Sequence, residues 1–172
     1  MKVGNIYRII SRVINMASKT NAVRIVQQKK YPFKEAFYDY DPDDLNGMHA
    51  AQAIGFPPEQ VFKTLVAKGN KNGILVFCLP VCCELDLKKA AKAANDKSVE
   101  LVAVKDLLAL TGYIRGGCSP IGMKKAFKTW MDESCLMHDT ICFSGGKRGC
   151  QIEMKTQDFL SYTKAGTASF SK

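Results

Sequence analysis

The chain of 172 residues and 19.0 kDa is long enough for one domain with its own hydrophobic core. Apolar residues make up 47% and charged residues 24% of it, proportions typical of a globular protein and not of a disordered one. The net charge of +9 suits a polyanionic partner but equally suits simple solubility, so charge alone identifies no partner.

The first fifteen residues place apolar side chains at helical spacing, with Arg8 and Arg12 between them. These arginines interrupt the apolar core that a secretory signal needs, and no apolar run in the chain reaches membrane-spanning length. A basic amphipathic helix suits contact with a membrane surface or RNA. The alternative, which we favour, is an appended extension over residues 1–15, with Met16 beginning a domain that spans 16–172 and does not contact a membrane.

Helices and strands alternate from residue 20 onward. In chain order, the pattern predicts a helix capped by Thr20 or Asn21 and ended before Pro32, a strand at 33–38, a helix at 48–54, strands at 61–67 and 74–79 joined as a hairpin, a helix at 85–94, a strand at 99–102, a helix at 105–110, strands at 127–131, 140–143 and 151–154, and a last helix from about 157 to 163. The tail beyond Gly166 is polar. Without repeats or linkers, this order indicates one α+β domain with a mixed, mostly antiparallel sheet.

Two glycine-rich loops are the main local signal of a site. Residues 111–122 hold four glycines, and residues 144–149 enclose Lys147 and Arg148 between glycines. Glycine lets backbone N–H groups approach a ligand, so such loops can hold an oxyanion or a phosphate. Neither matches a P-loop, and no G-x-G-x-x-G sequence opens a helix; one such loop alone is more often a tight turn. Two of them in basic surroundings favour a phosphate-rich ligand.

Lys63 interrupts an apolar strand. If Phe62, Thr64 and Val66 face one way, Lys63 shares the other face with Val61 and Leu65. One interpretation is an edge-strand lysine that opposes aggregation. The other is a cation in a pocket, where it would hold a phosphate or polarise an ester carbonyl.

The seven cysteines include no C-x-x-C pair, and the chain has only two histidines. We therefore expect reduced, mostly buried thiols in a cytoplasmic protein, without a metal site. Cys118 would need His49 or His138 as a base to act as a nucleophile. A small apolar side chain in a tight loop is the stronger interpretation, and no Ser-His-Asp order or carboxylate pair stands out.

Four blocks occur in a characteristic order: VFKTL at 61–65, LDLKKAAKA at 85–93, TGYIRGGCSPIG at 111–122 and SGGKRG at 144–149. Together they resemble the YbaK/EbsC family of Cys-tRNA(Pro) deacylases, which is related to the editing domain inserted in bacterial prolyl-tRNA synthetases. The resemblance covers about residues 19–162. It implies a barrel-like mixed sheet of six or seven strands surrounded by helices, a cytoplasmic location, and no cofactor or metal.

The resemblance also implies a pocket between the Lys63 strand and the glycine loops that receives the 3′ end of a mischarged tRNA. Lys63 would hold the terminal adenosine, and the backbones of Gly116 and Gly117 would contact the aminoacyl carbonyl, which makes these three the catalytic candidates. The expected substrate-binding residues are Tyr38, Thr64, Ser119, Ser144, Gly145, Lys147 and Arg148. Cysteinyl-specific members need no protein nucleophile, because the substrate thiol attacks its own ester.

Other functions remain open at this point. The segment 43–48 departs in length from some members, which leaves an Ala-tRNA(Pro) deacylase as an alternative substrate class. A non-catalytic module that binds tRNA or a synthetase is a second alternative, with prolyl-tRNA synthetase as the candidate partner. A hydrolase built on Cys118 is the third.

Overall fold

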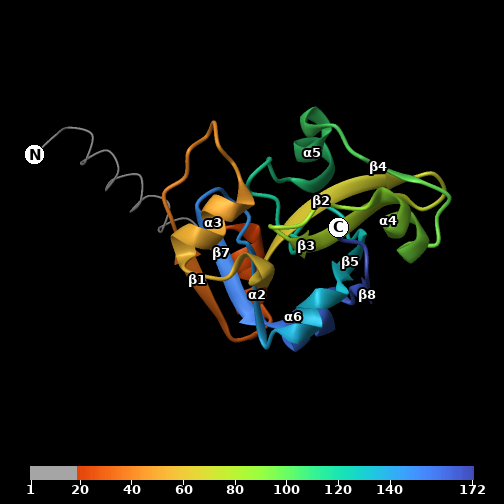
Figure 1. The fold of residues 1–172 in the computed structure, drawn as a ribbon. Coiled ribbons are helices and arrows are strands. Elements are labelled where there is room, and N and C mark those ends of the chain that lie inside the picture. The colour runs from red at the N-terminus through yellow and green to blue at the C-terminus, as the bar shows by residue number, and fades with distance from the viewer. Residues whose placement is uncertain (1–18) are drawn as a thin grey trace, which may run out of the picture.

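The computed structural model describes residues 19–172, drawn in colour in Figure 1. The expected extension at 1–15 and the start at Met16 lie outside these residues. The described chain folds into one eight-stranded sheet with helices around it, and none of these helices is long and apolar enough to cross a membrane. The α+β prediction is confirmed.

The strands are β1 (Phe33–Phe37), β2 (Val61–Gly69), β3 (Gly73–Pro80), β4 (Val99–Leu101), β5 (Lys128–Asp132), β6 (Thr140–Ser144), β7 (Cys150–Lys155) and β8 (Gly166–Ala168). The α-helices are α2 (Asn21–Gln28), α3 (Gly47–Ile54), α4 (Leu87–Ala93), α5 (Val104–Thr111) and α6 (Thr156–Thr163), and two 3₁₀ helices are η1 (Pro58–Gln60) and η2 (Glu133–Met137). Every predicted helix and strand is present, with bounds that shift by one to three residues.

Side-chain caps set several helix starts. Thr20 accepts a hydrogen bond from Val23 N and so begins α2, while Asn46 does the same for α3 through Met48 N. The Thr20 hydroxyl also donates to the carbonyl oxygen of Gly145, which ties the start of α2 to the second glycine loop. Asp86 caps α4, so this helix begins at Leu87, two residues later than predicted.

The strand order is β1-β7-β6-β2-β3-β5-β8, and β4 adds to β2. The β1–β7, β6–β7, β2–β3 and β2–β4 pairs are antiparallel, whereas β2–β6, β3–β5 and β5–β8 are parallel. The sheet is therefore mixed, with antiparallel pairs in a small majority. Its eight strands correct the expected six or seven: the polar tail supplies β8, which pairs with β5.

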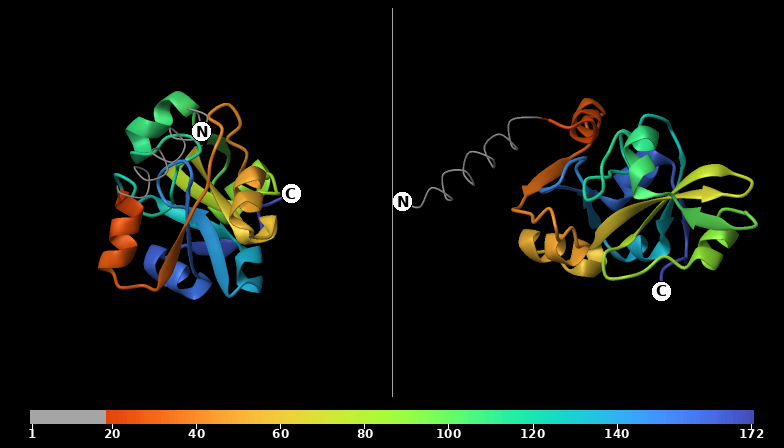
Figure 2. Two further views of the ribbon diagram at one scale, coloured as in Figure 1. Left: turned by 90° about the vertical axis from the view of Figure 1, so that its left-hand side faces the viewer. Right: turned by 90° about the horizontal axis from the view of Figure 1, so that it is seen from above.

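Helices cover the sheet on several sides, as the two views of Figure 2 show. The largest hydrophobic cluster packs α2 and α6 against the inner face, where Phe62, Phe143 and Phe159 are fully buried. A second cluster joins α4 to β3 and includes Phe170 from the C-terminal tail. All seven cysteines lie in the described part, each is free, and five are buried, as expected.

Candidate functional site

Four polar side chains form a row across neighbouring strands β1, β7, β6 and β2. Tyr38 follows the last residue of β1, Gln151 lies at the start of β7, and Ser144 pairs with Gln151 at the end of β6. Lys63 comes one residue after the last β2 residue paired with β6. Because side chains alternate along a strand, all four lie on the face opposite the inner core. They line one cavity.

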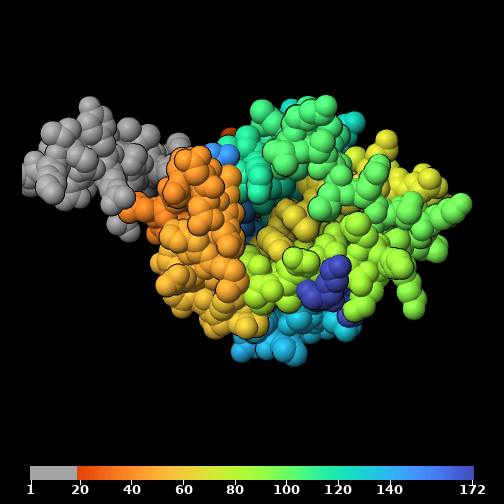
Figure 3. Space-filling model, turned by 45° about the horizontal axis from the view of Figure 1, so that its top comes forward, coloured from red at the N-terminus to blue at the C-terminus, as the bar shows by residue number. Residues whose placement is uncertain are grey.

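The cavity has a volume of about 600 Å³. Its cover comes from the segment before α3, from α5 and from the first glycine loop, which contribute Leu45, Leu107 and Gly116 to the lining. Figure 3 shows the hollow between the orange atoms near α3 and the green atoms around α5. This volume is that of a small-molecule site and is large enough to take a nucleoside.

The floor of the cavity is a gap in the sheet. On this side of β2, β6 pairs only with Val61 and Phe62, and β4 begins to pair only at Ala67. The carbonyl oxygen of Val66 accepts from Val102 N on the same side at 3.0 Å. Backbone groups alternate in direction along a strand, so Thr64 turns its N–H and C=O toward the gap, where no described strand pairs with them.

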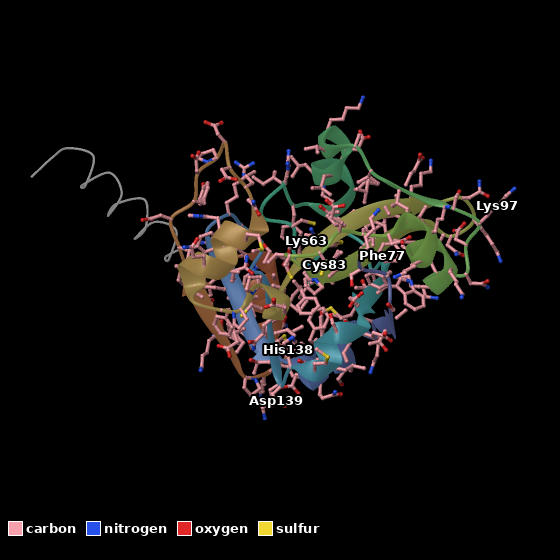
Figure 4. All side chains as sticks on the ribbon, viewed as in Figure 1. Lys63, Phe77, Cys83, Lys97, His138 and Asp139 are labelled. Atoms are coloured by element: carbon pink, nitrogen blue, oxygen red, sulfur yellow. The ribbon has the colours of Figure 1, made fainter. Side chains whose placement is uncertain are left out.

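Lys63 lies in a central strand, between β6 and β3, so the edge-strand interpretation is wrong. Its predicted face is confirmed: Phe62 enters the inner core, while Val61 packs beneath α3 on the other face. The side chain is half-buried and lines the cavity near the middle of the molecule (Figure 4). Within residues 19–172, its ammonium has no ion pair or hydrogen bond. It is therefore a partly desolvated cation that an anionic ligand can neutralise.

The two glycine loops pack directly on each other. A Cβ atom on Gly117 would lie 2.9 Å from Lys147 Cα, so only glycine allows this approach. The Arg148 Nε donates to the carbonyl oxygen of Arg115 at 3.0 Å. Gly116 adopts a φ of +84°, which favours glycine, and faces Leu45. The loops thus form one unit that brings Gly116 and Arg148 to the cavity wall.

Six of the ten predicted site residues line the cavity: Tyr38, Lys63, Thr64, Gly116, Ser144 and Arg148. The other four shape the loops around it. Gly117 donates its N–H to Ile114 O, so this N–H is already occupied, and Gly145 donates to Cys150 O. Ser119 is fully buried and accepts from Ile121 N, while Lys147 lies 5.8 Å from the centre of the Phe37 ring and lines a neighbouring pocket.

Gln151 was missed by the sequence reasoning. It is only 7% exposed, lines the cavity, and its Oε1 has no hydrogen-bond partner among the described residues. A buried acceptor without a partner costs about 1–3 kcal/mol of stability. Unpaired buried groups of this kind are a common feature of ligand sites. Burial raises the pKa of Tyr38, and the adjacent Gln151 side chain partly offsets this rise. No sequence signal marks it, because β7 alternates apolar and polar residues and Gln151 occupies an ordinary polar position of that pattern.

The part of the cavity wall that residues 19–172 form contains a thiol but no activated nucleophile. Cys118 lines the wall, and burial raises its pKa to about 11, so the thiol is protonated at neutral pH. Of the two histidines, His49 is exposed and contacts the Asp39 carbonyl oxygen, and His138 lies at the opposite side of the molecule from the cavity (Figure 4). No cluster of His, Cys, Asp or Glu in residues 19–172 suits a metal ion. These observations argue against a hydrolase built on Cys118.

Comparisons with known proteins identify similar sequences and a similar fold. Residues 48–162 match the aminoacyl-tRNA editing domain. The chain is 50% identical over 145 residues to a protein of Enterococcus faecalis named as the Cys-tRNA(Pro)/Cys-tRNA(Cys) deacylase EbsC, covering 84% of this chain and 88% of that one. A proline–tRNA ligase of Fervidobacterium nodosum is 31% identical over 85 residues, 49% of this chain and 15% of the ligase. The crystal structure of a protein described as a trans-editing enzyme for prolyl-tRNA synthetase superposes with a TM-score of 0.76 at 23% identity, covering 90% of this chain and 99% of that one, which shows a shared fold.

Proposed function

The chain belongs to the aminoacyl-tRNA editing domain family, and from this premise we propose that it is a deacylase that removes cysteine from Cys-tRNA(Pro). The observation that carries the proposal is the Lys63 ammonium beside the gap in the sheet, which has no partner among the described residues. A cation at this position suits the phosphate or ribose of the terminal adenosine. The backbone of Thr64 suits the aminoacyl group that follows it, because its N–H and C=O face the same cavity.

The absence of an activated nucleophile from the described cavity favours chemistry that the substrate itself performs. In the proposed reaction, the cysteinyl Sγ forms a bond to the ester carbonyl carbon, and the bond from that carbon to the adenosine 3′ oxygen breaks. The thiol proton ends on the 3′ oxygen, which restores the free hydroxyl. Water then opens the cyclic thioester and releases cysteine. The protein contributes orientation of the thiol and stabilisation of the carbonyl oxygen as it becomes negative.

We assign the stabilising N–H group to Thr64 rather than to Gly117. The Gly117 N–H is already bonded to Ile114 O, whereas the Thr64 N–H faces the gap. Gly116 belongs to the cavity wall, where a Cβ atom would lie 3.1 Å from the Leu45 side chain. Gln151 and Tyr38 form a polar wall that suits the α-ammonium or a ribose hydroxyl of the substrate.

The test is release of labelled amino acid from Cys-tRNA(Pro), with Ala-tRNA(Pro) in parallel, by the wild type, Lys63→Ala and a control variant. Lys97→Ala is a matched control, since Lys97 is exposed and lies at the far tip of the molecule (Figure 4). We expect release of cysteine by the wild type and the control, and its loss in Lys63→Ala. Cleavage of the alanyl ester alone would make the protein an Ala-tRNA(Pro) deacylase. Cleavage of neither ester would refute the deacylase proposal.

A second substrate tests the chemistry. S-methylcysteinyl-tRNA(Pro) differs from the cysteinyl ester by one methyl group on the sulfur, and it therefore has no free thiol. Substrate-assisted cleavage predicts that this ester survives under conditions in which the cysteinyl ester is cleaved within minutes. Equal rates for the two esters would exclude attack by the substrate thiol. The nucleophile would then be a protein group or water.

We further propose that the choice among tRNAs involves prolyl-tRNA synthetase as a partner. The cavity volume of about 600 Å³ admits only the aminoacylated 3′ end, which all tRNAs share. Discrimination between Cys-tRNA(Pro) and Cys-tRNA(Cys) then requires contacts elsewhere. Adding prolyl-tRNA synthetase should raise the ratio of the two deacylation rates, and an unchanged ratio would argue against this partner.

A further inference from the structure

A second, smaller pocket adjoins the cavity. It has a volume of about 240 Å³ and is lined by Tyr40, Gly112, Tyr113, Ile114, Gly146, Lys147 and Arg148. Tyr40 and Arg148 line both spaces, so they stand at the boundary between the pocket and the cavity. We call this space the basic pocket. It is built from both glycine loops and from the turn after β1.

The chemistry of the basic pocket suits one nucleotide. Two cations, Lys147 and Arg148, come from consecutive positions of the second glycine loop. Gly112 and Gly146 both have positive φ, so the walls of the pocket include backbone without side chains. Tyr40 is 37% exposed, which leaves part of this aromatic residue open to a stacking partner. The phosphate of a nucleotide would thus meet two cations, its sugar would meet the glycine backbone, and its base would meet the Tyr40 ring.

We propose that the basic pocket binds the nucleotide that precedes the terminal adenosine of the tRNA. Lys147 and Arg148 contact the phosphodiester that links the two nucleotides, and Tyr40 stacks on the preceding base. The proposal rests on the proposed function, because it places the adenosine in the cavity. It follows from the shared boundary: a strand whose last nucleoside fills the cavity leaves past Arg148 and Tyr40 into the basic pocket.

Two substrates of different length test this assignment. Cysteinyl-adenosine fills the cavity alone, whereas a cysteinyl C-C-A trinucleotide also reaches the basic pocket. The informative quantity is the ratio of kcat/KM for the trinucleotide to kcat/KM for cysteinyl-adenosine. We expect Lys147→Gln to lower this ratio about tenfold, which corresponds to one charge-assisted contact. Tyr40→Ala should lower it about fivefold or more, the loss of one stacked base.

Salt dependence and charge replacement separate a phosphate contact from a structural effect. Removing one phosphate contact reduces the slope of log affinity against log salt by about 0.7 for a single strand. Lys147→Gln should show this change for binding of the uncharged C-C-A trinucleotide, and Lys147→Arg should restore the slope. Lys97→Gln, which removes the same charge from a remote exposed position, should leave ratio and slope at wild-type values.

The outcomes distinguish the two proposals. Hydrolysis of both substrates with an unchanged ratio in Lys147→Gln and Tyr40→Ala would overturn the basic pocket and leave the deacylase intact. Trinucleotide binding that depends on Lys147 and Tyr40, without hydrolysis of either substrate, would support the basic pocket and refute the proposed activity. Competition by inorganic phosphate as strong as by the trinucleotide would reduce the basic pocket to a simple anion site and overturn the nucleotide assignment.

Discussion

Gly117→Ala is the substitution whose effect follows most directly from the geometry. The new Cβ would lie 2.9 Å from Lys147 Cα, 3.0 Å from Lys147 C and 3.1 Å from Arg148 N, all of them backbone atoms. Carbon atoms pack at about 3.5 Å or more, so the two glycine loops must separate by about 0.5 Å. No side chain can rotate to relieve the contact. Overpacking of this kind costs about 1–3 kcal/mol of stability.

The displacement reaches the cavity because Gly116 and Arg148 flank the contact. A misplacement of about 1 Å can cost 100-fold in rate, so half of that predicts about a tenfold fall in kcat/KM. The assay is cysteine release from Cys-tRNA(Pro), with thermal unfolding of the same samples. Gly73→Ala is the matched control: its φ of +70° makes alanine strained, but no atom of the described chain lies within 4 Å of the new Cβ. It should lose about 1 kcal/mol of stability and keep its activity.

Two results would refute the reasoning on Gly117. Wild-type kcat/KM and unfolding temperature in Gly117→Ala would mean that the loops are not in the tight contact described. If the two variants lower the stability by the same amount and Gly117→Ala loses no more activity than Gly73→Ala, the loss is due to lower stability and not to a change in the cavity wall.

Four further predictions follow from single residues. Lys63→Ala should lower kcat/KM by about 100-fold, as loss of one preorganised charge contact does, while the unfolding temperature measured by circular dichroism changes little. Cys118→Ala should keep at least about a third of the deacylase activity, because a thiol with a pKa of about 11 is protonated at neutral pH; a 100-fold loss would restore the nucleophile hypothesis. Gln151→Leu should unfold at the same or a higher temperature yet lose activity, since it removes an unpaired buried acceptor from the cavity; lower stability would show that Gln151 serves the fold. Burial alone would raise the pKa of Asp132, but hydrogen bonds from Ser134 and the Phe170 amide outweigh it and hold this pKa below its usual value. The ionised Asp132 therefore stabilises the fold fully above its unfolded pKa of about 3.9, and this stabilisation is lost as the pH falls through its folded pKa. Asp132→Asn should lower the free energy of unfolding at pH 7, and denaturation curves of wild type and variant should approach each other below about pH 4.

Most of the fold could be predicted because its signals are local. Thr20 and Asn46 cap helices, Gly55 ends α3 in the left-handed conformation, and the residues between β2 and β3 form a hairpin turn. The strand β8 could not be predicted in this way. Its three residues are small or polar, and it forms only through parallel pairing with the distant β5. Pairing of this kind leaves no periodicity in the sequence.

The candidate site shows the same division. Lys63 and the glycine loops stood out because their residue types break the local pattern, whereas Ser144 was expected only from the resemblance of its motif to the family. The gap in the sheet did not, because it depends on where β6 stops and β4 begins along β2. Ser119 and Gly145 belong to the recognisable loop motifs. However, the Ser119 hydroxyl and the Gly145 N–H form hydrogen bonds that hold the loops in shape. Motif membership identified loops that border the cavity but not which of their atoms face it.

The gap beside Thr64 also has a consequence for ligand design. A short interruption in a sheet offers one donor and one acceptor at the spacing of a missing strand, which is how extended peptides are bound by β-augmentation. A stable amide in place of the scissile ester would present the matching pair of groups to Thr64, while an acidic group at its other end would reach Lys63. Inhibitors of this protein can therefore be peptide-like rather than nucleotide-like, because the backbone of β2 presents a donor and an acceptor side by side at the floor of the cavity.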